Sequence, residues 1–227
     1  MKNVIVTGAS RGIGYYTALR FAEQGHQVLA LARSNDKLKA LKKEASAEGR
    51  IQILALDLAR DIDVEAITSI FDKVDVLINN AGALVNKPFS EITPQEMMTV
   101  YQANVFAPYF LVQKLLPYFS ADAHIINIGS VGGVNGTMKF PGLSAYSSSK
   151  AAASCLSECW QAEFADSDFT FNSLALGAVQ TEMLEEAFPG YEAPLSPIQM
   201  SEYICRFALN DGQFVRGKTV LVSRSNP

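Results

Sequence analysis

Histidine and cysteine are scarce in this sequence, which has two histidines and three cysteines among 227 residues. An odd number of cysteines gives no disulfide framework and is typical of proteins in a reducing compartment. Cys155 and Cys159 share a helix face, but no histidine lies near them in the sequence to complete a metal-binding set. We therefore expect two small buried hydrophobes there and no metal site. His26 and His124 stand where turns enter strands, which argues against a histidine-based nucleophilic triad.

The sequence also lacks runs of lysine or arginine and long apolar stretches, and its formal charge is -4. It has no electrostatic footprint for DNA, RNA or an anionic membrane, and no segment as long as a membrane span or signal core. These features exclude nucleic-acid and membrane partners and predict a cytoplasmic protein. A chain of this length that is 48% hydrophobic can bury one substantial core, which predicts a single domain over residues 1–227.

Short apolar runs alternate with longer segments of helical period along most of the chain. Strands that are apolar throughout and separated by helices indicate a parallel sheet covered on both faces. The pattern predicts a doubly wound α/β fold with about seven strands. The predicted strands cover residues 3–8, 27–33, 51–57, 74–82, 124–130, 169–177 and the end of the chain from 217. The predicted helices cover residues 11–25, 35–49, 63–71, 94–119 and 146–164, and a last helix follows residue 197.

Residues that start or stop helices agree with these boundaries. Gly25 and Gly49 stand where a C-terminal cap belongs, and Thr93-Pro-Gln-Glu96 is a capping box with proline at the first helical position. Segment 177–197 is rich in proline and glycine and interrupts the alternation. Because segments after the C-terminal ends of strands line the ligand crevice of a doubly wound fold, we predict that this irregular insertion is a substrate lid.

After the first predicted strand the chain reads Thr7-Gly-Ala-Ser-Arg-Gly-Ile-Gly14 and passes directly into a helix. Such glycines allow a tight turn, close approach of a pyrophosphate to the backbone and close helix packing, and the helix N-terminus offers free N–H groups. Glycines also simply end strands, so a glycine cluster alone is weak. The strand-turn-helix context makes this segment a predicted phosphate site.

Six features occur in order along the chain: TGASRGIG from Thr7, ALDL around Asp57, NNAG from Asn79, then Asn104, IGS ending at Ser130, and YSSSK from Tyr146. Together they resemble the short-chain dehydrogenase/reductase family, from residue 1 to about residue 183. The resemblance implies a Rossmann-type fold, an oxidoreductase activity, and catalytic roles for Asn104, Ser130, Tyr146 and Lys150. It also implies cofactor contacts by Gly8, Ser10, Arg11, Gly12, Ile13, Gly14, Arg33, Asp57, Leu58, Asn80, Ala81, Gly82, Tyr146, Lys150, Val179 and Thr181.

Arg33 ends the second predicted strand, where an enzyme that uses NAD commonly carries an acid. An arginine there can pair with a 2′-phosphate through a bidentate contact, and Arg11 in the glycine turn could reach the same phosphate. We therefore predict a preference for NADP(H) over NAD(H); the alternative is that both are solvated surface arginines. Asp57 either accepts from the adenine amino group, as the resemblance implies, or caps a helix. Asn79 and Asn80 either close the strand beside the cofactor or only satisfy buried strand ends.

Reduction of a carbonyl group leaves an alkoxide that needs a proton, and Tyr146 with Lys150 one helical turn away can supply it. A cation about 5 Å from the phenol, at an effective dielectric near 20, is worth roughly 3 kcal/mol, or about two pKa units before desolvation is subtracted. We therefore predict that Lys150, together with a positively charged oxidised nicotinamide, favours the phenolate, which burial opposes. Ser130 can donate to the substrate oxygen as its negative charge develops. The resemblance implies that Lys150 also holds the nicotinamide ribose and that Asn104 holds a water that links Lys150 to solvent.

Three features depart from the family pattern. The segment between Ser130 and Tyr146 is a few residues longer than usual, Leu176-Gly177 replaces the usual Pro-Gly, and the C-terminal tail lacks the usual Asp-Gly pair. The resemblance still implies that Val179 and Thr181 meet the nicotinamide carboxamide, through a less rigid turn. The serines at 147–149 are explained better by close helix packing than as nucleophiles, since no general base accompanies them.

The sequence predicts an NADP(H)-dependent oxidoreductase that transfers a hydride between the nicotinamide and a carbonyl or secondary alcohol, acting mainly as a carbonyl reductase. The alternative is a dinucleotide-binding regulatory protein of the same fold without significant turnover. The resemblance also implies a homodimer or homotetramer, assembled through two long helices. Six apolar residues would line a pocket for a hydrophobic ketone or aldehyde, unless they only pack their own loops: Met138, Phe140, Leu143, Met183, Phe188 and Tyr191.

Overall fold

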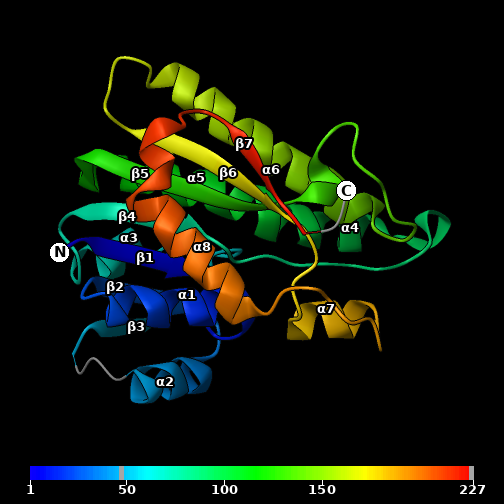
Figure 1. The fold of residues 1–227 in the computed structure, drawn as a ribbon, viewed down its shortest axis with the longest axis horizontal. Coiled ribbons are helices and arrows are strands. Elements are labelled where there is room, and N and C mark those ends of the chain that lie inside the picture. The colour runs from blue at the N-terminus through cyan, green and yellow to red at the C-terminus, as the bar shows by residue number, and fades with distance from the viewer. Residues whose placement is uncertain (46–48, 225–227) are drawn as a thin grey trace.

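Within residues 1–45 and 49–224, which the computed structural model describes, the apolar runs form seven parallel strands in one sheet of order β3-β2-β1-β4-β5-β6-β7 (Figure 1). This confirms the predicted doubly wound parallel sheet. The strand order changes direction between β1 and β4, at the topological switch point where such sheets bind ligands. The strands are β1 (Asn3–Thr7), β2 (Gln27–Ala32), β3 (Ile51–Ala55), β4 (Val74–Asn79), β5 (Phe119–Ser130), β6 (Thr170–Leu176) and β7 (Thr219–Val222).

Helices cover both faces of the sheet (Figure 1). Successive residues of the inner strands point to opposite faces, and the residues on each face are apolar. Val4 and Val6 of β1 belong to a buried cluster with residues of α1, α2 and α8, whereas Ile5 between them packs with α3, α5 and α6. A strand buried on both faces shows the continuous apolar run that was seen in the sequence. The covering helices are α1 (Gly12–Glu23), α2 (Asn35–Glu44) and α8 (Pro197–Leu209) on one face, and α3 (Val64–Thr68), α5 (Ala107–Leu115) and α6 (Ser144–Glu163) on the other.

The segment predicted as one long helix from Pro94 to about Phe119 is helical but changes its winding inside. Its predicted capping box is confirmed, since Thr93 accepts from the Glu96 N–H and Glu96 accepts from the Thr93 N–H. Its parts are α4 (Pro94–Tyr101), a π-helical turn η2 (Gln102–Phe106), α5, and a 3-10 turn η3 (Leu116–Tyr118).

The π turn has a local cause. Pro108 has no N–H to give to the carbonyl of Asn104 four residues earlier, so one α-helical bond is lost. The Ala107 N–H bonds instead to the Gln102 carbonyl, five residues back. Such single π turns occur often at functional sites, and this one carries a predicted catalytic residue.

The two predicted glycine caps had different outcomes. Gly25 closes α1 with φ +88°: its N–H bonds to the Ala22 carbonyl at 3.0 Å, and the next N–H bonds to the Phe21 carbonyl at 3.1 Å. The cap predicted at Gly49 is wrong, because α2 ends at Glu44 with Ala45 as its C-cap. Residues 46–48 of that predicted helix lie outside the described residues.

Other parts of the chain also differ from the prediction. β5 starts at Phe119 rather than His124, and α6 starts at Ser144, two residues before Tyr146. The insertion 177–197 is more regular than predicted, since it contains α7 (Glu182–Ala187) and an isolated bridge that pairs its two ends. Figure 1 shows α7 beyond the C-terminal edge of the sheet. Shorter 3-10 turns are η1 (Phe89–Glu91), η4 (Val131–Gly133) and η5 (Asp211–Phe214).

The outer face of α6 corrects one prediction about cysteine. Cys155 and Cys159 are exposed, so the expectation of two small buried hydrophobes is wrong. The buried face carries small polar residues instead: Ser154 Oγ lies 2.9 Å from Ser173 Oγ of β6, and Ser157 donates to a β6 carbonyl. Among the helices in the described part of the chain, none is long and apolar enough to cross a membrane.

Candidate active site

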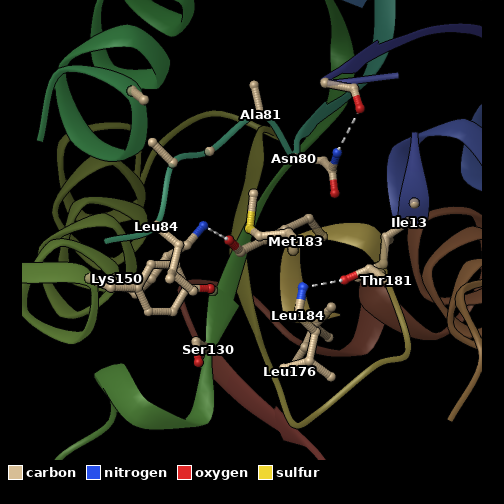
Figure 2. Close-up of a pocket in the computed structure, with 18 of the residues that line it drawn as sticks. Ile13, Asn80, Ala81, Leu84, Ser130, Lys150, Leu176, Thr181, Met183 and Leu184 are labelled. Carbon is tan, nitrogen blue, oxygen red and sulfur yellow. Dashed lines mark hydrogen bonds between the residues drawn. The ribbon is translucent and has the colours of Figure 1, made fainter. Parts of the chain in front are cut away.

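A cavity of about 1110 Å³ lies at the C-terminal edge of the sheet, beside the switch point. Figure 2 shows Lys150 and Ser130 on one side of it and Ile13 and Thr181 on the other. Of the described residues that were predicted for the site, all but Gly14 and Asn104 line this cavity. Those that line it are Gly8, Ser10, Arg11, Gly12, Ile13, Arg33, Asp57, Leu58, Asn80, Ala81, Gly82, Ser130, Tyr146, Lys150, Val179 and Thr181.

The turn after β1 has the geometry of a phosphate cradle. Gly8 has φ +68°, and a Cβ there would lie 2.8 Å from the Ala81 Cα. A Cβ on Gly14 would meet the Gly8 carbonyl oxygen at 2.6 Å, so Gly14 acts through packing behind the turn. α1 then begins at Gly12 without a side-chain cap and without an acidic residue in its first turn. Its free N–H groups and partial positive charge fit the pyrophosphate of a dinucleotide.

Hydrogen bonds from β4 hold this turn in place. The Thr7 hydroxyl accepts from the N–H groups of Asn80 and Ala81, both at 3.0 Å. The Asn80 side-chain amide donates to the carbonyls of Thr7 at 3.0 Å and Gly8 at 3.3 Å. Asn80 thus positions the cradle, as well as lining the cavity. Thr7 was not among the predicted site residues, although a lone hydroxyl at the end of an apolar strand was a usable signal.

Asn79 belongs to the interior of the sheet. Its side-chain amide donates to Asn127 Oδ1 of β5 at 2.9 Å, and both side chains are buried. The alternative that Asn79 satisfies a buried strand end therefore describes it well, whereas its neighbour Asn80 faces the turn.

The ends of β2 and β3 bring Arg33 and Asp57 to the same end of the cavity. The helix-cap alternative for Asp57 is wrong, because α3 starts farther along the chain with Asp63 as its N-cap. Asp57 instead accepts from the Ala59 N–H at 3.2 Å in a local turn. Arg33 is exposed at the rim, whereas Arg11 is paired with Glu186 of α7 through both of its terminal nitrogens.

Ser130, Tyr146 and Lys150 meet at the other end, despite the longer segment between the first two. Ser130 interacts with the Tyr146 hydroxyl and lowers its pKa, and the Ser130 hydroxyl accepts from the Gly132 N–H at 3.3 Å. Lys150 Nζ lies 5.8 Å from the centre of the Tyr146 ring and donates to the Ile128 carbonyl at 2.7 Å. The i, i+4 spacing on α6 therefore places both side chains at the same cavity wall.

Burial decides the proton affinities of this pair. Burial raises the pKa of Tyr146 to about 12, although the hydrogen bond from Ser130 lowers it, and burial lowers the pKa of Lys150 to about 8. In the protein alone, burial therefore outweighs the effect of the ammonium, and the combined effect of Lys150 and an oxidised nicotinamide on Tyr146 stays a prediction. The ammonium is directed at the Ile128 carbonyl and lies over the ring, so desolvation of the phenol dominates.

Asn104 lies in the π turn behind the cavity wall, with its side chain fully used. Its Oδ1 accepts from the Ala83 N–H at 2.8 Å, and its Nδ2 donates to the Ala83 carbonyl at 2.9 Å and to Ser149 Oγ at 2.8 Å. Ser149 in turn donates to the Tyr146 carbonyl at 2.7 Å. These bonds join the loop after β4 to the helix that carries Tyr146. The prediction of simple helix packing at the serines missed this bond of Ser149.

Two glycines allow close approach around Lys150. A Cβ on Gly82 would lie 3.0 Å from Asn104 Oδ1 and 3.5 Å from Lys150 Nζ. A Cβ on Gly133, which was not predicted, would lie 2.7 Å from the backbone nitrogen of Ala151. The loop after Ser130 can therefore lie directly on α6, which brings Ser130 to Tyr146.

α7 and the segments next to it form the remaining wall. Thr181 caps α7 by accepting from the Leu184 N–H at 3.3 Å, and Asn86 donates to the Ala187 carbonyl at 2.8 Å (Figure 2 shows the first bond). The six apolar residues predicted for a substrate pocket all line the cavity. The prediction missed a contribution from one face of α4, where an i, i+3, i+4 pattern could have shown it: Gln95, Met98 and Thr99.

Fold and site together define an oxidoreductase with a dinucleotide cradle and a serine-tyrosine-lysine group, and comparison with known proteins gives the family. The family model for short chain dehydrogenases matches residues 2–192, and the chain belongs to that family. Enzymes of this family bind a nicotinamide dinucleotide, act on small molecules and commonly form oligomers.

Two curated relatives and one solved structure illustrate the similarity. The chain is 35% identical to the L-xylo-3-hexulose reductase of Hypocrea jecorina, with 84% of this chain and 70% of that protein covered. It is 28% identical to a 3-oxoacyl-(acyl-carrier-protein) reductase of Thermotoga maritima, with 96% and 95% covered. The crystal structure of a 3-ketoacyl-(acyl-carrier-protein) reductase from Brucella melitensis, complexed with NADH, superposes with a TM-score of 0.87 at 25% identity, covering 99% and 98% of the two chains.

Proposed function

We propose that this chain is an NADP(H)-dependent reductase that converts a hydrophobic ketone or aldehyde to the alcohol. One observation carries the proposal: a single cavity has the uncapped N-terminus of α1 at one end and the group Ser130, Tyr146 and Lys150 at the other. The first end suits the phosphates of a dinucleotide, and the second suits proton transfer to a carbonyl oxygen. The names of both curated relatives describe reductases, which supports this direction.

The residues around the cradle would hold the cofactor along its length. The turn from Gly8 to Ile13 would bind the pyrophosphate, Arg33 the 2′-phosphate, and Asp57 with Leu58 the adenine. Asn80, Ala81 and Gly82 would lie against the adenosine ribose, and Lys150 would hold the nicotinamide ribose. Val179 and Thr181 would meet the carboxamide; the Thr181 hydroxyl accepts from the Leu184 N–H and so keeps its own proton to donate.

The proposed chemistry uses the proton that Tyr146 retains. When bound, the cofactor would supply the hydride for the carbonyl carbon. Ser130 donates a hydrogen bond to the carbonyl oxygen as negative charge develops, and Tyr146 gives its proton to that oxygen. With a pKa of about 12, Tyr146 is a phenol at neutral pH, which suits an acid in the reductive direction.

Lys150 and Asn104 would restore the proton. Burial places the pKa of Lys150 at about 8, so this amine can lose and regain a proton near neutral pH. The Asn104 carbonyl lacks its α-helical donor because Pro108 has no N–H, which leaves that oxygen suited to hold a relay water.

The substrate end of the cavity favours an uncharged, apolar compound. Six charged residues line the cavity within the described part of the chain. Apart from Lys150 and Glu182, they lie at the glycine turn and after β2 and β3, at the cofactor end: Arg11, Arg33, Asp57 and Arg60. Apolar side chains from the loop after Ser130 and from the segment around α7 line the other end. This wall would bury a hydrophobic substituent next to the reacting carbonyl group.

Assembly and compartment are part of the same proposal. Phe106, Tyr109 and Phe110 are partly exposed on the π turn and α5, which supports a homodimer or homotetramer through this surface. Light scattering on a size-exclusion column would measure the assembly, and a monomer would contradict it. The exposed thiols of Cys155 and Cys159 suit the cytoplasm, where they stay reduced.

Replacement of Tyr146 with Phe tests the function. We expect wild-type protein to bind NADPH, measured by fluorescence, and to oxidise it with members of a panel of apolar ketones and aldehydes. Y146F should bind NADPH with similar affinity and lose about 10²- to 10⁴-fold in turnover, the usual contribution of a general acid. Absence of NADPH binding by the wild type would refute the proposal. Binding without turnover of any carbonyl compound would favour a regulatory dinucleotide-binding protein.

A further inference from the structure

An acidic face of α7 lies against the predicted phosphate site. Glu186 accepts hydrogen bonds from both terminal nitrogens of Arg11, one of them at 3.1 Å. Glu182 stands one helical turn earlier, and a Cβ on Gly12 would lie 3.4 Å from its carboxylate. The carboxylate of Glu182 also acts electrostatically on Arg11. α7 thus presents two negative charges to the turn that would receive phosphate.

Glu186 and the two predicted phosphate-binding arginines share one small space. A second cavity of about 330 Å³ is lined by Arg11, Arg33 and Glu186, together with residues of the loop after β4 such as Asn86. The Arg11 side chain is 34% exposed and that of Glu186 is 63% exposed, so the ion pair lies at the rim, where solutes can reach it.

A carboxylate and a phosphate bind a guanidinium in the same bidentate way. A 2′-phosphate that reaches Arg11 must therefore replace Glu186 or lie beside it. Two anions that lie side by side on one guanidinium repel each other. A cofactor without the 2′-phosphate has no such conflict. We propose that Glu186 is a specificity-determining residue, which occupies Arg11 in the free protein and weakens binding of the 2′-phosphorylated dinucleotide relative to the unphosphorylated one.

The same contact links the cofactor end to the substrate end. Glu186 lies on the short helix whose residues Met183 and Leu184 line the main cavity, and Phe188 follows directly after it. Loss of the Arg11 contact leaves α7 held on this side by the bond from Asn86 to the Ala187 carbonyl. Among the described residues, displacement of Glu186 by phosphate therefore removes one of the two side-chain contacts that join α7 to the rest of the site.

Replacement of Glu186 with Gln tests the proposal, which rests on the binding of a nicotinamide dinucleotide at this site as proposed above. Glu192 provides the matched control: it is exposed in the same insertion, and within the described residues it makes no ion pair or side-chain hydrogen bond. Wild type, E186Q and E192Q are titrated with NADPH and with NADH by fluorescence. Adenosine 2′,5′-bisphosphate and adenosine 5′-monophosphate, titrated by calorimetry, repeat the comparison without the nicotinamide.

We expect E186Q to bind NADPH about two- to five-fold more tightly than wild type, the range that an exposed ion pair commands, with NADH affinity unchanged. The bisphosphate should show the same gain over the monophosphate, and E192Q should match wild type. Equal changes for both dinucleotides in E186Q, or none, would overturn this role of Glu186 and leave the NADP(H) proposal standing. If the wild type prefers NADH and E186Q gains affinity for NADPH alone, the NADP(H) proposal would be overturned and the role of Glu186 would stand. A protein that binds neither dinucleotide would overturn both.

Discussion

Replacing Lys150 with Met should remove a pH dependence of folding that the buried ammonium creates. Lys150 is 6% exposed, and burial lowers its pKa from 10.5 to about 8. Between these values the unfolded chain binds the lysine proton and the folded chain does not, so the free energy of unfolding rises with pH in this interval. At 1.36 kcal/mol per pKa unit, the rise across the whole interval is about 3 kcal/mol.

Denaturant titrations of wild type and K150M between about pH 7 and pH 10.5 measure this effect. The difference in unfolding free energy, wild type minus K150M, should stay constant below about pH 8. It should then grow by about 1.4 kcal/mol per pH unit. Tyr146 acts in the opposite direction at higher pH, because its raised folded-state pKa of about 12 makes stability fall above pH 10. Both proteins keep Tyr146, so the difference isolates the lysine.

A difference that does not change between about pH 8 and pH 10.5 would refute the reasoning. Lys150 would then keep an ordinary pKa and stay charged up to about pH 10. The measurement therefore decides whether the amine beside Tyr146 gives up its proton easily or stays a permanent cation.

Two further substitutions test the polar interior. S149A should lower the unfolding free energy by about 1–3 kcal/mol in denaturant titrations, because it leaves a buried N–H of Asn104 without an acceptor. The control S148A, at an exposed position, should change the unfolding free energy by less than about 0.5 kcal/mol. Burial lowers the pKa of His124 from 6.5 to about 4, so the unfolding free energy of wild type should fall by about 3 kcal/mol as the pH falls through that interval, while that of H124Q changes little. His124 Nε2 accepts from Asn172, and an acid-insensitive wild type would show that the folded protein takes up a proton at His124 as readily as the unfolded chain does.

Period and spacing were enough to predict the sheet and the location of the site. Apolar runs gave the parallel strands, and the rule that ligands bind at the C-terminal ends of such strands places Gly8, Ser130 and Val179 around one cavity. The family resemblance then named residues that periodicity alone does not distinguish, such as Asn104. The geometry of the pair Tyr146 and Lys150 also followed from helical spacing.

Properties that depend on tertiary packing did not follow from the sequence. The sign of the pKa shift of Tyr146 depends on how deeply the phenol is buried and where the ammonium is directed. The exposed cysteines were misjudged because α6 buries small polar side chains that bond to β5 and β6, so hydrophobicity indicated the wrong face. The Arg11–Glu186 pair joins residues far apart in the chain, and no local pattern marks such a contact.

The π-helical turn η2 lets α4 and α5, which form one continuous helical segment, pack against two different parts of the protein. Each residue of an α-helix advances the side-chain direction by about 100°, so one extra residue in a turn shifts the phase of everything after it by that amount. Before the turn, Met98 and Thr99 face the cavity; after it, Leu111 and Leu115 are buried in the core. Deletion of one residue between them would put the two halves back in step, and they could no longer both face their present partners.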